Sequence, residues 1–308
     1  MPKVSVVIPT YNRCNFLEEA LRSVFAQTYQ DFEILVVDDA SSDKTQKTIY
    51  EKFGEYIDLG RIKYLRNKRK MERSYSRNRG IKKATGRYIA FLDDDDVWLP
   101  NHLDTLRKFM DKHPNIGLSF STAIRLYEEV PQRVPEGLKE GFGKIYRDKC
   151  IYGRVGVLPC SMVRNYVFTT IGGFQEDLNY GEDTEFFARV AMNYDIGYLE
   201  NVTCCLIRRG IRDASEKLYY SKLKVLQAIV DDMNRFGYES SDEKISLFYI
   251  KLSEYLLRID LDKAKTYLWK ALKKNKGLLS MSLTWKIIAR IFAGHNIYNF
   301  LKKIYQPK

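Results

Sequence analysis

The sequence predicts an α/β protein in which a mostly parallel sheet flanked by helices is followed by an α-helical C-terminal region. Through the first 120 residues, apolar runs of strand length alternate with segments whose apolar residues recur at helical spacing. Two of the apolar runs end abruptly at aspartates, as buried strands do at a sheet edge that binds ligands. Beyond about residue 214 the spacing is helical throughout. We therefore expect two domains, residues 1–214 and residues 215–308.

Four apolar runs of the first domain are bounded by polar or turn residues, which indicates parallel strands joined by right-handed helical crossovers. These strands are residues 4–8, 33–37, 62–65 and 88–92. The first crossover helix is expected to start at Asn15, an N-cap residue with Glu18 three positions later. Residues 41–43 are expected to cap the second helix, which runs to about Phe53, and the third spans about residues 72–84.

The segments that follow are less regular. A helix near Leu103 and a strand at residues 116–124 precede residues 127–150, which contain Pro and Gly and are expected to form a long loop, a lid or an acceptor-side element. Order returns at residues 155–163, and a further helix is expected to open at Gly181. The last two strands are expected at residues 196–199 and 202–207. The C-terminal helices are expected at residues 218–236, 243–259, 261–273 and 281–292.

Composition excludes several classes of protein. Apolar residues make up 45% and charged residues 29% of the chain, which is typical of a globular protein, and no stretch approaches the length of an apolar membrane span. No secretory signal precedes the first strand, so we expect a cytoplasmic protein. The five cysteines are scattered, and none has ligand spacing with a histidine, which disfavours a structural zinc site.

Four consecutive aspartates, Asp93 to Asp96, follow the fourth apolar run. Mg²⁺ or Mn²⁺ prefers oxygen ligands and usually takes one or two protein carboxylates, with water and phosphate oxygens in its other positions. The four aspartates therefore predict a site for a divalent cation and a nucleotide diphosphate at the sheet edge. An acidic solvated loop is the alternative, since charge runs often mark exposure.

The common nucleotide-binding and hydrolase motifs are absent from the sequence. The first strand runs into Pro9 and Tyr11 rather than into G-x-G-x-x-G, and neither G-x-x-x-x-G-K-[ST] nor G-x-S-x-G occurs. A dinucleotide dehydrogenase, a P-loop enzyme and an α/β-hydrolase are therefore disfavoured. A nucleotide base stacked on Tyr11 and bonded to Asp39 would place its diphosphate near the aspartates, unless Tyr11 is only a capping aromatic.

Seven motifs, taken in order and spacing, resemble the family 2 glycosyltransferases of GT-A fold over about residues 3–210. They are residues 4–13, 23–29 and 36–43, the pair Arg77-Asn78, the D-x-D-like Asp93-Asp94-Asp95, the turn Gly172-Gly173-Phe174 and the acidic pair Glu182-Asp183. Each motif alone is weak, but together they are highly specific. The resemblance implies a GT-A fold.

The resemblance also implies a role for each matching residue. The nucleotide-binding positions are Pro9, Tyr11, Asp39, Arg77, Asp93 and the middle residue Asp94. Asp93 and Asp95 match the metal-binding positions for Mn²⁺ or Mg²⁺, Asp183 matches the general base, and Gly173 and Glu182 match the acceptor side. Without the resemblance, Asp183 would be read as an acid that complements a helix dipole. Asp96 is expected to cap the following turn.

The implied activity is inverting transfer of a sugar from a nucleotide donor, usually a UDP-sugar, to a glycan or lipid-linked acceptor, as in cell-envelope polysaccharide biosynthesis. A non-catalytic protein that binds nucleotide sugars or membrane surfaces on the same fold is the alternative, and the presence of Asp95 and Asp183 disfavours it. Many relatives carry a histidine or another polar metal ligand near the end of the domain. Residues 208–212 contain none, so the sequence does not identify a third metal ligand. The donor sugar, the acceptor and the oligomeric state are also left open.

The net charge of +12 is concentrated near the C-terminus, where residues 263–308 contain eleven Lys or Arg and no Asp or Glu. Together with apolar residues such as Trp285, they form amphipathic helices of the kind that lie on an anionic membrane. We therefore consider a peripheral contact with the inner face of the plasma membrane. Packing on the catalytic domain or on a second subunit explains the same pattern. No recognition motif for nucleic acid accompanies the charge.

Overall fold

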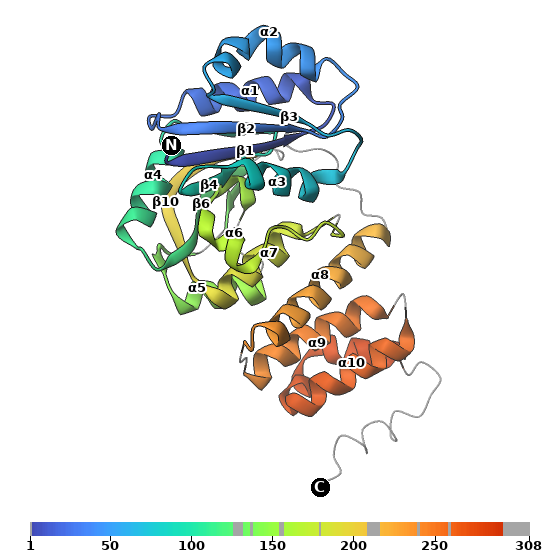
Figure 1. The fold of residues 1–308 in the computed structure, drawn as a ribbon. Helices are drawn as coiled ribbons and strands as arrows, with labels where there is room; N and C mark the ends of the chain where they lie inside the picture. Colours follow the sequence, from blue (N-terminus) through green and yellow to red (C-terminus); the bar gives the residue numbers. More distant parts are fainter. Residues whose placement is uncertain are drawn as a thin grey trace. The chain divides into compact units, whose positions relative to one another are not determined.

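The computed structural model describes residues 2–125, 132–135, 138–153, 157–178, 180–207, 216–238, 241–257 and 260–291. The chain divides into two compact units near residue 212. The N-terminal unit is an α/β domain and the C-terminal unit is helical (Figure 1). This architecture confirms the predicted fold class.

A mixed sheet of ten strands, counted over the described residues, forms the centre of the N-terminal unit. Its main path runs β3-β2-β1-β4-β9-β6-β10-β5, and the first four strands on this path are parallel. The strands are β1 (Val4–Thr10), β2 (Phe32–Asp38), β3 (Ile62–Arg66), β4 (Tyr88–Phe91), β5 (Asp96–Trp98), β6 (Ile116–Arg125), β7 (Gln132–Val134), β8 (Gly141–Phe142), β9 (Ser161–Arg164) and β10 (Asp195–Ile207).

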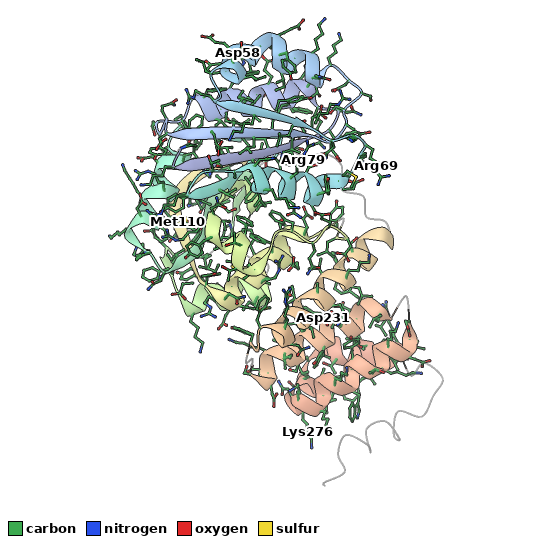
Figure 2. The ribbon with its side chains drawn as sticks, in the orientation of Figure 1. Asp58, Arg69, Arg79, Met110, Asp231 and Lys276 are labelled. Carbon is green, nitrogen blue, oxygen red and sulfur yellow. The ribbon has the colours of Figure 1, made fainter. Side chains whose placement is uncertain are left out.

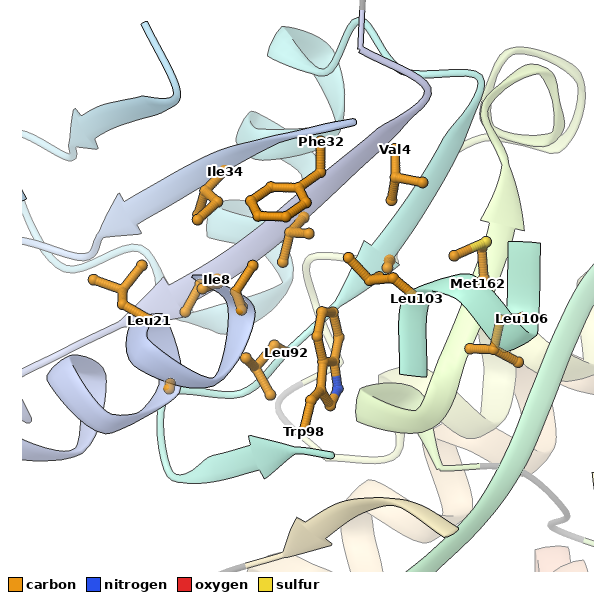
Figure 3. Close-up of a cluster of buried hydrophobic side chains, with 14 of the residues drawn as sticks. Val4, Ile8, Leu21, Phe32, Ile34, Leu92, Trp98, Leu103, Leu106 and Met162 are labelled. Carbon is orange, nitrogen blue, oxygen red and sulfur yellow. The ribbon is translucent and has the colours of Figure 1, made fainter. Parts of the chain in front are cut away.

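Helices cover both faces of this sheet. They are α1 (Cys14–Phe25), α2 (Thr45–Asp58), α3 (Glu72–Lys83), α4 (His102–Lys112), α5 (Lys144–Gly153), α6 (Asn165–Ile171) and α7 (Glu182–Asn193). Helices α1 and α2 lie on one face and α3 on the other (Figure 1). The alternate residues of β1 and β2 that point toward α1 are fully buried, as expected for a strand between two helical layers. Figure 3 shows part of this core, with Val4, Ile8, Leu21, Phe32, Ile34, Leu92, Trp98, Leu103, Leu106 and Met162.

Helix α3 packs closely on the sheet because it has a glycine at the contact. A Cβ atom on Gly80 would lie 2.5 Å from Cγ1 of Val7 in β1, so a larger residue would push the helix away. The close approach carries Arg77 and Asn78, one turn earlier on the helix, toward the carboxyl edge of the sheet.

Several local predictions were wrong. Asn15 lies inside α1 instead of capping it, and the N-cap position belongs to Arg13. Residues 127–150 are not one loop, since β7, β8 and most of α5 lie within them. Asp96 begins strand β5, which pairs antiparallel with β10 across the sheet, so it does not simply cap a turn. The two expected strands at 196–207 are a single strand, β10, whose register shifts between Leu199 and Thr203.

The C-terminal unit packs its helices around its own apolar core. The helices are α8 (Glu216–Arg235), α9 (Asp242–Leu256), α10 (Leu261–Lys274), the 3₁₀ helix η2 (Lys276–Ser280) and α11 (Ser282–Ile291). Side-chain oxygens cap two of them: Ser241 accepts from Lys244 N at 3.3 Å and Asp260 from Lys263 N at 3.0 Å. No helix in the described ranges has the length and apolar character needed to cross a membrane.

Candidate active site

The carboxyl ends of β1, β2 and β4 meet at one edge of the sheet. Thr10, the last residue of β1, pairs with Asp38, the last residue of β2, and accepts a backbone hydrogen bond from Asp39 N at 2.9 Å. The Thr10 hydroxyl donates to Oδ2 of Asp94 at 2.8 Å. The parallel register therefore brings the ends of the first two strands and the aspartates after β4 together, as the sequence predicts.

Asp39 organises the segment that enters α3. Its Oδ1 accepts from Asn67 Nδ2 at 2.7 Å and from Met71 N at 2.8 Å, and its Oδ2 accepts from Glu72 N at 2.8 Å. Exposed Arg69 lies in this segment (Figure 2). The carboxylate thus caps the start of α3 from a neighbouring strand end, and this cap is a contact that the sequence did not predict. The expected contact of Asp39 with a base stays a prediction.

Tyr11 stands at the same edge with an exposed ring, 39% accessible. The ammonium of Lys70 lies 4.8 Å from the ring centre, in cation–π geometry. Pro9, by contrast, is buried within β1. A base that stacks on Tyr11 would share this ring with Lys70 or replace it.

Arg13 neutralises two of the aspartates. Its Nη1 lies 2.6 Å from Oδ2 of Asp95 and 3.1 Å from Oδ1 of Asp94. Burial raises the pKa of Asp94 to about 6, with the neighbouring carboxylates adding to the effect. Burial and the charge of Asp93 also raise the pKa of Asp95. Three adjacent carboxylates are therefore held together against their mutual repulsion.

The same carboxylates fit a hard divalent cation. Asp93 and Asp95 would supply oxygen ligands, and a bound cation would offset both the burial of Asp95 and its repulsion from Asp93, which together raise its pKa. Among the described residues, no three His, Cys, Asp or Glu side chains are grouped as metal ligands. Two carboxylates suffice for Mg²⁺ or Mn²⁺ when phosphate oxygens complete the coordination. Residues 208–212, where a third ligand was sought, lie outside the described residues.

Arg77 links the aspartates to the late acidic pair. The arginine is 2% exposed, and its Nη2 lies 2.6 Å from Oδ1 of Asp93 while its Nη1 lies 2.7 Å from Oε1 of Glu182. Burial would raise the pKa of Asp93, but the Arg77 guanidinium outweighs it and holds that pKa below its usual value. A single guanidinium thus joins residues far apart in the sequence. The expected contact of Arg77 with the nucleotide is untested, but both of its terminal nitrogens already bind protein carboxylates.

Asp183 occupies the first turn of α7, directly after Glu182. Its Oδ1 accepts from Thr184 N at 2.7 Å. Burial, followed by the charge of Glu182, raises the pKa of Asp183 to about 6. A carboxyl group with a pKa near neutrality is suited to accept a proton during a reaction.

The turn before α7 is fixed by Asn78. Phe174 N donates to Oδ1 of Asn78 at 2.8 Å, and Asn78 Nδ2 donates to Phe174 O at the same distance. A Cβ atom on Gly173 would lie 2.2 Å from that Oδ1, so only glycine allows this pair of hydrogen bonds. Gly173 therefore positions the turn, and its expected role on the acceptor side stays a prediction.

Gly173→Ala is expected to lower the free energy of unfolding by about 1–3 kcal/mol, because the new methyl group must displace Asn78 from Phe174. Urea denaturation followed by circular dichroism measures the change. Gly54→Ala in α2 is the matched control, since its Cβ would meet no atom within 4 Å and the helix should be no less stable. Equal stabilities for the two variants would contradict the assigned role of Gly173.

Arg13, Lys70 and Asn67 belong to the site but were not among the predicted residues. Arg13 follows Tyr11 by two positions at the end of β1, so its position at the edge was readable from the sequence. Its pairing with Asp94 and Asp95 could not be predicted, because these residues lie more than 80 positions away along the chain.

Comparison with known proteins identifies the class. The sequence profile described as glycosyl transferase family 2 matches residues 5–172, more than half of the chain. The chain belongs to glycosyl transferase family 2, which confirms the resemblance in its motifs.

One curated relative is the GalNAc(5)-diNAcBac-PP-undecaprenol beta-1,3-glucosyltransferase of Campylobacter jejuni. It is 43% identical over 107 residues, which cover 34% of this chain and 34% of the relative. The chain spans about a third of the length of the curated relatives that it matches first.

Two solved structures share the fold. Staphylococcus aureus TarS in complex with UDP superposes with a TM-score of 0.67 at 20% identity, covering 94% of this chain and 86% of that chain. The mannosyltransferase PcManGT of Pyrobaculum calidifontis, in complex with GDP-Man and Mn²⁺, gives a TM-score of 0.60 at 18% identity, covering 100% and 88%. At these identities the likeness confirms the GT-A-like fold.

Proposed function

We propose that this protein is an inverting, metal-assisted glycosyltransferase that moves a sugar from a nucleotide donor, a UDP-sugar, to a glycan or lipid-linked acceptor in cell-envelope polysaccharide biosynthesis. The observation that carries the proposal is the buried bridge through Arg77, which joins Asp93 of the acidic segment to Glu182 beside Asp183. The bridge supports the proposal because one guanidinium pairs with Asp93, the proposed cation ligand, and with the residue that precedes Asp183, the proposed base. The undecaprenol-linked acceptor named for the Campylobacter jejuni relative supports the acceptor class, and the UDP bound to TarS supports the donor.

In the proposed mechanism, each part of the network has a separate task. Tyr11 and Asp39 hold the nucleotide base, and Asp93 and Asp95 hold the cation, for which the Mn²⁺ of PcManGT is the precedent. When bound, Mn²⁺ or Mg²⁺ offsets the negative charge that develops on the departing diphosphate. Asp183 accepts the proton of the acceptor hydroxyl as this oxygen attacks the anomeric carbon. One displacement inverts that carbon, and Asp183 needs no covalent bond to the sugar.

The metal-binding role of Asp95 is tested by Asp95→Asn. The variant is expected to bind UDP in the presence of Mn²⁺ at least about tenfold more weakly, since a metal ion contributes several kcal/mol of charge stabilisation. Calorimetric titration with UDP, with Mn²⁺ and then with chelator, measures the difference. Asp58→Asn, at the exposed end of α2 (Figure 2), is the control and should behave as the wild type.

The donor is tested directly by hydrolysis and transfer assays over a panel of nucleotide sugars. Activity with at least one UDP-sugar, lost on chelation, is the expected result. Binding of nucleotide sugars without any turnover on the whole panel would favour the non-catalytic alternative.

A membrane partner is also proposed, for the C-terminal unit. The side chains of Trp269 and Trp285 are 41% and 45% exposed, and Lys273 Nζ lies 4.9 Å from the Trp269 ring. Lys270 follows Trp269 in the sequence, and its ammonium lies over the rings of Tyr249 and Tyr267 in the same unit. Exposed tryptophans among basic residues are typical of proteins that bind anionic lipid surfaces.

Replacing Lys270 and Lys273 together with Gln should lower the partition coefficient onto phosphatidylglycerol-containing vesicles about thirtyfold, since each basic side chain near the surface contributes about 1 kcal/mol. Vesicle flotation of the full chain measures this. The control replaces Lys47 and Lys108 of the N-terminal unit with Gln, which removes the same charge. Equal loss in both variants, or equal binding to neutral phosphatidylcholine, would contradict the proposed surface.

A further inference from the structure

Arg13 forms an ion pair with Asp95, the carboxylate that the proposed cation would need. The residue stands at the N-cap of α1, and its Nη1 lies 2.6 Å from Oδ2 of Asp95. The same nitrogen lies 3.1 Å from Oδ1 of Asp94, which is separately held by the Thr10 hydroxyl at 2.8 Å. Asp94 thus has a second side-chain partner in Thr10, whereas Arg13 is the cation that pairs with Asp95 in the described part of the chain.

A guanidinium and a divalent cation cannot share this position. A cation bound to Asp95 would lie within a few ångströms of the charge on Arg13, and like charges at that separation repel strongly in a partly buried site. The Arg13 side chain is 42% exposed, so it can leave the carboxylate for solvent without unfolding the surrounding structure. Asp95, whose side chain is 21% exposed, is more enclosed and stays in place.

We propose that Arg13 is an internal counter-ion that holds Asp95 until a divalent cation arrives together with a nucleotide diphosphate. This proposal rests on the metal site of the proposed function. The diphosphate changes the balance because it brings oxygen ligands for the cation and negative charge for the released guanidinium. A cation alone brings neither and must displace Arg13 without compensation. The protein should therefore bind the metal ion weakly by itself and well as a metal–nucleotide complex.

The decisive measurement is binding of Mn²⁺ alone, followed by electron paramagnetic resonance of the free ion. Arg13→Ala is expected to bind Mn²⁺ about tenfold more tightly than the wild type, because the competing charge is gone. Addition of UDP should reduce the difference to less than about threefold, since the diphosphate removes the penalty in the wild type. Arg13→Lys should lie between the two, because a lysine keeps the charge without the planar fork.

Arg22→Ala is the matched control. Arg22 lies on the same helix, pairs with Glu18 at 2.8 Å and is also exposed, so its loss changes the net charge equally without touching the aspartates. Mn²⁺ binding by this variant should match the wild type. If Arg13→Ala binds Mn²⁺ no more tightly than the wild type, or not measurably at millimolar concentration, the proposal is overturned.

Asp95→Asn separates this proposal from the metal site on which it rests. If Asp95→Asn binds Mn²⁺ with UDP as well as the wild type does, the metal site itself is wrong. If Asp95→Asn loses that binding while Arg13→Ala leaves Mn²⁺ affinity unchanged, the metal site stands and only the role of Arg13 fails. In the double variant, the gain from Arg13→Ala should disappear, because the two residues act on the same carboxylate.

Discussion

Asp183→Asn is expected to slow sugar transfer by about a thousandfold or more while UDP binding stays within about threefold of the wild type. The amide cannot accept the proton of the acceptor hydroxyl, but it keeps the shape of the carboxyl and its place in the first turn of α7. Single-turnover transfer assays and calorimetric titration with UDP measure the two quantities separately. Asp195→Asn is the control, since Asp195 begins β10 at the opposite edge of the sheet.

The pH dependence of the wild type follows from the same residue. Burial and Glu182 raise the pKa of Asp183 to about 6, and the base must be ionised to work, so the rate should rise through about pH 6 and level off above it. Because the pKa is raised in the folded state, ionisation of Asp183 costs stability above that pH. Asp183→Asn should therefore melt no lower than the wild type at pH 8, which distinguishes loss of the base from unfolding. Turnover by the variant within tenfold of the wild type would rule out the assignment.

The parallel core of the fold was predictable because its physical signals are local. Runs such as Val4 to Ile8 are mostly apolar, as expected for a strand buried on both faces, and all four such runs are strands. The antiparallel additions were not predictable. Strand β5 is three residues long and exists only because it pairs with β10, which lies more than 90 residues later in the sequence. Within residues 127–150, the two-residue strand β8 also depends on β10, whereas the three-residue strand β7 pairs with β6, the strand before it.

The sequence predicted which residues gather at the sheet edge but not which of them bind one another. The edge of a parallel sheet brings Asp39 and Asp94 together from the order of the strands alone. The partners of each carboxylate depend on long-range geometry: Asp39 caps α3 and Asp95 binds Arg13. A charged side chain takes whichever partner the fold brings nearest, and periodicity carries no information on that choice. The sequence pattern also gives no sign of the close packing of α3 at Gly80, which positions Arg77.

Arg77→Gln should be among the most damaging substitutions in the N-terminal unit, with a loss of about 3–5 kcal/mol in the free energy of unfolding. The arginine is 2% exposed and is the nearest counter-ion of both Asp93 and the buried Glu182, so its removal leaves these two carboxylates poorly compensated. Urea denaturation at pH 8 measures the loss. Arg79→Gln is the matched control on the same helix (Figure 2). Arg79 donates to the amide oxygen of Asn67 at 2.7 Å, a neutral acceptor, so the change should cost about 1 kcal/mol.

Two further measurements separate lost charge compensation from lost packing. With Arg77 gone, the pKa of Asp93 in the folded state should rise, so the penalty applies where the carboxylate is ionised and fades as pH falls. The stability difference between Arg77→Gln and the wild type should therefore shrink from pH 8 to pH 5. Glu182→Gln added to Arg77→Gln should recover part of the loss, because it removes one uncompensated charge at nearly constant volume. A deficit that is independent of pH and unrelieved by Glu182→Gln would mean that Arg77 acts by filling space, and an electrostatic bridge from Asp93 to Glu182 would lose its support.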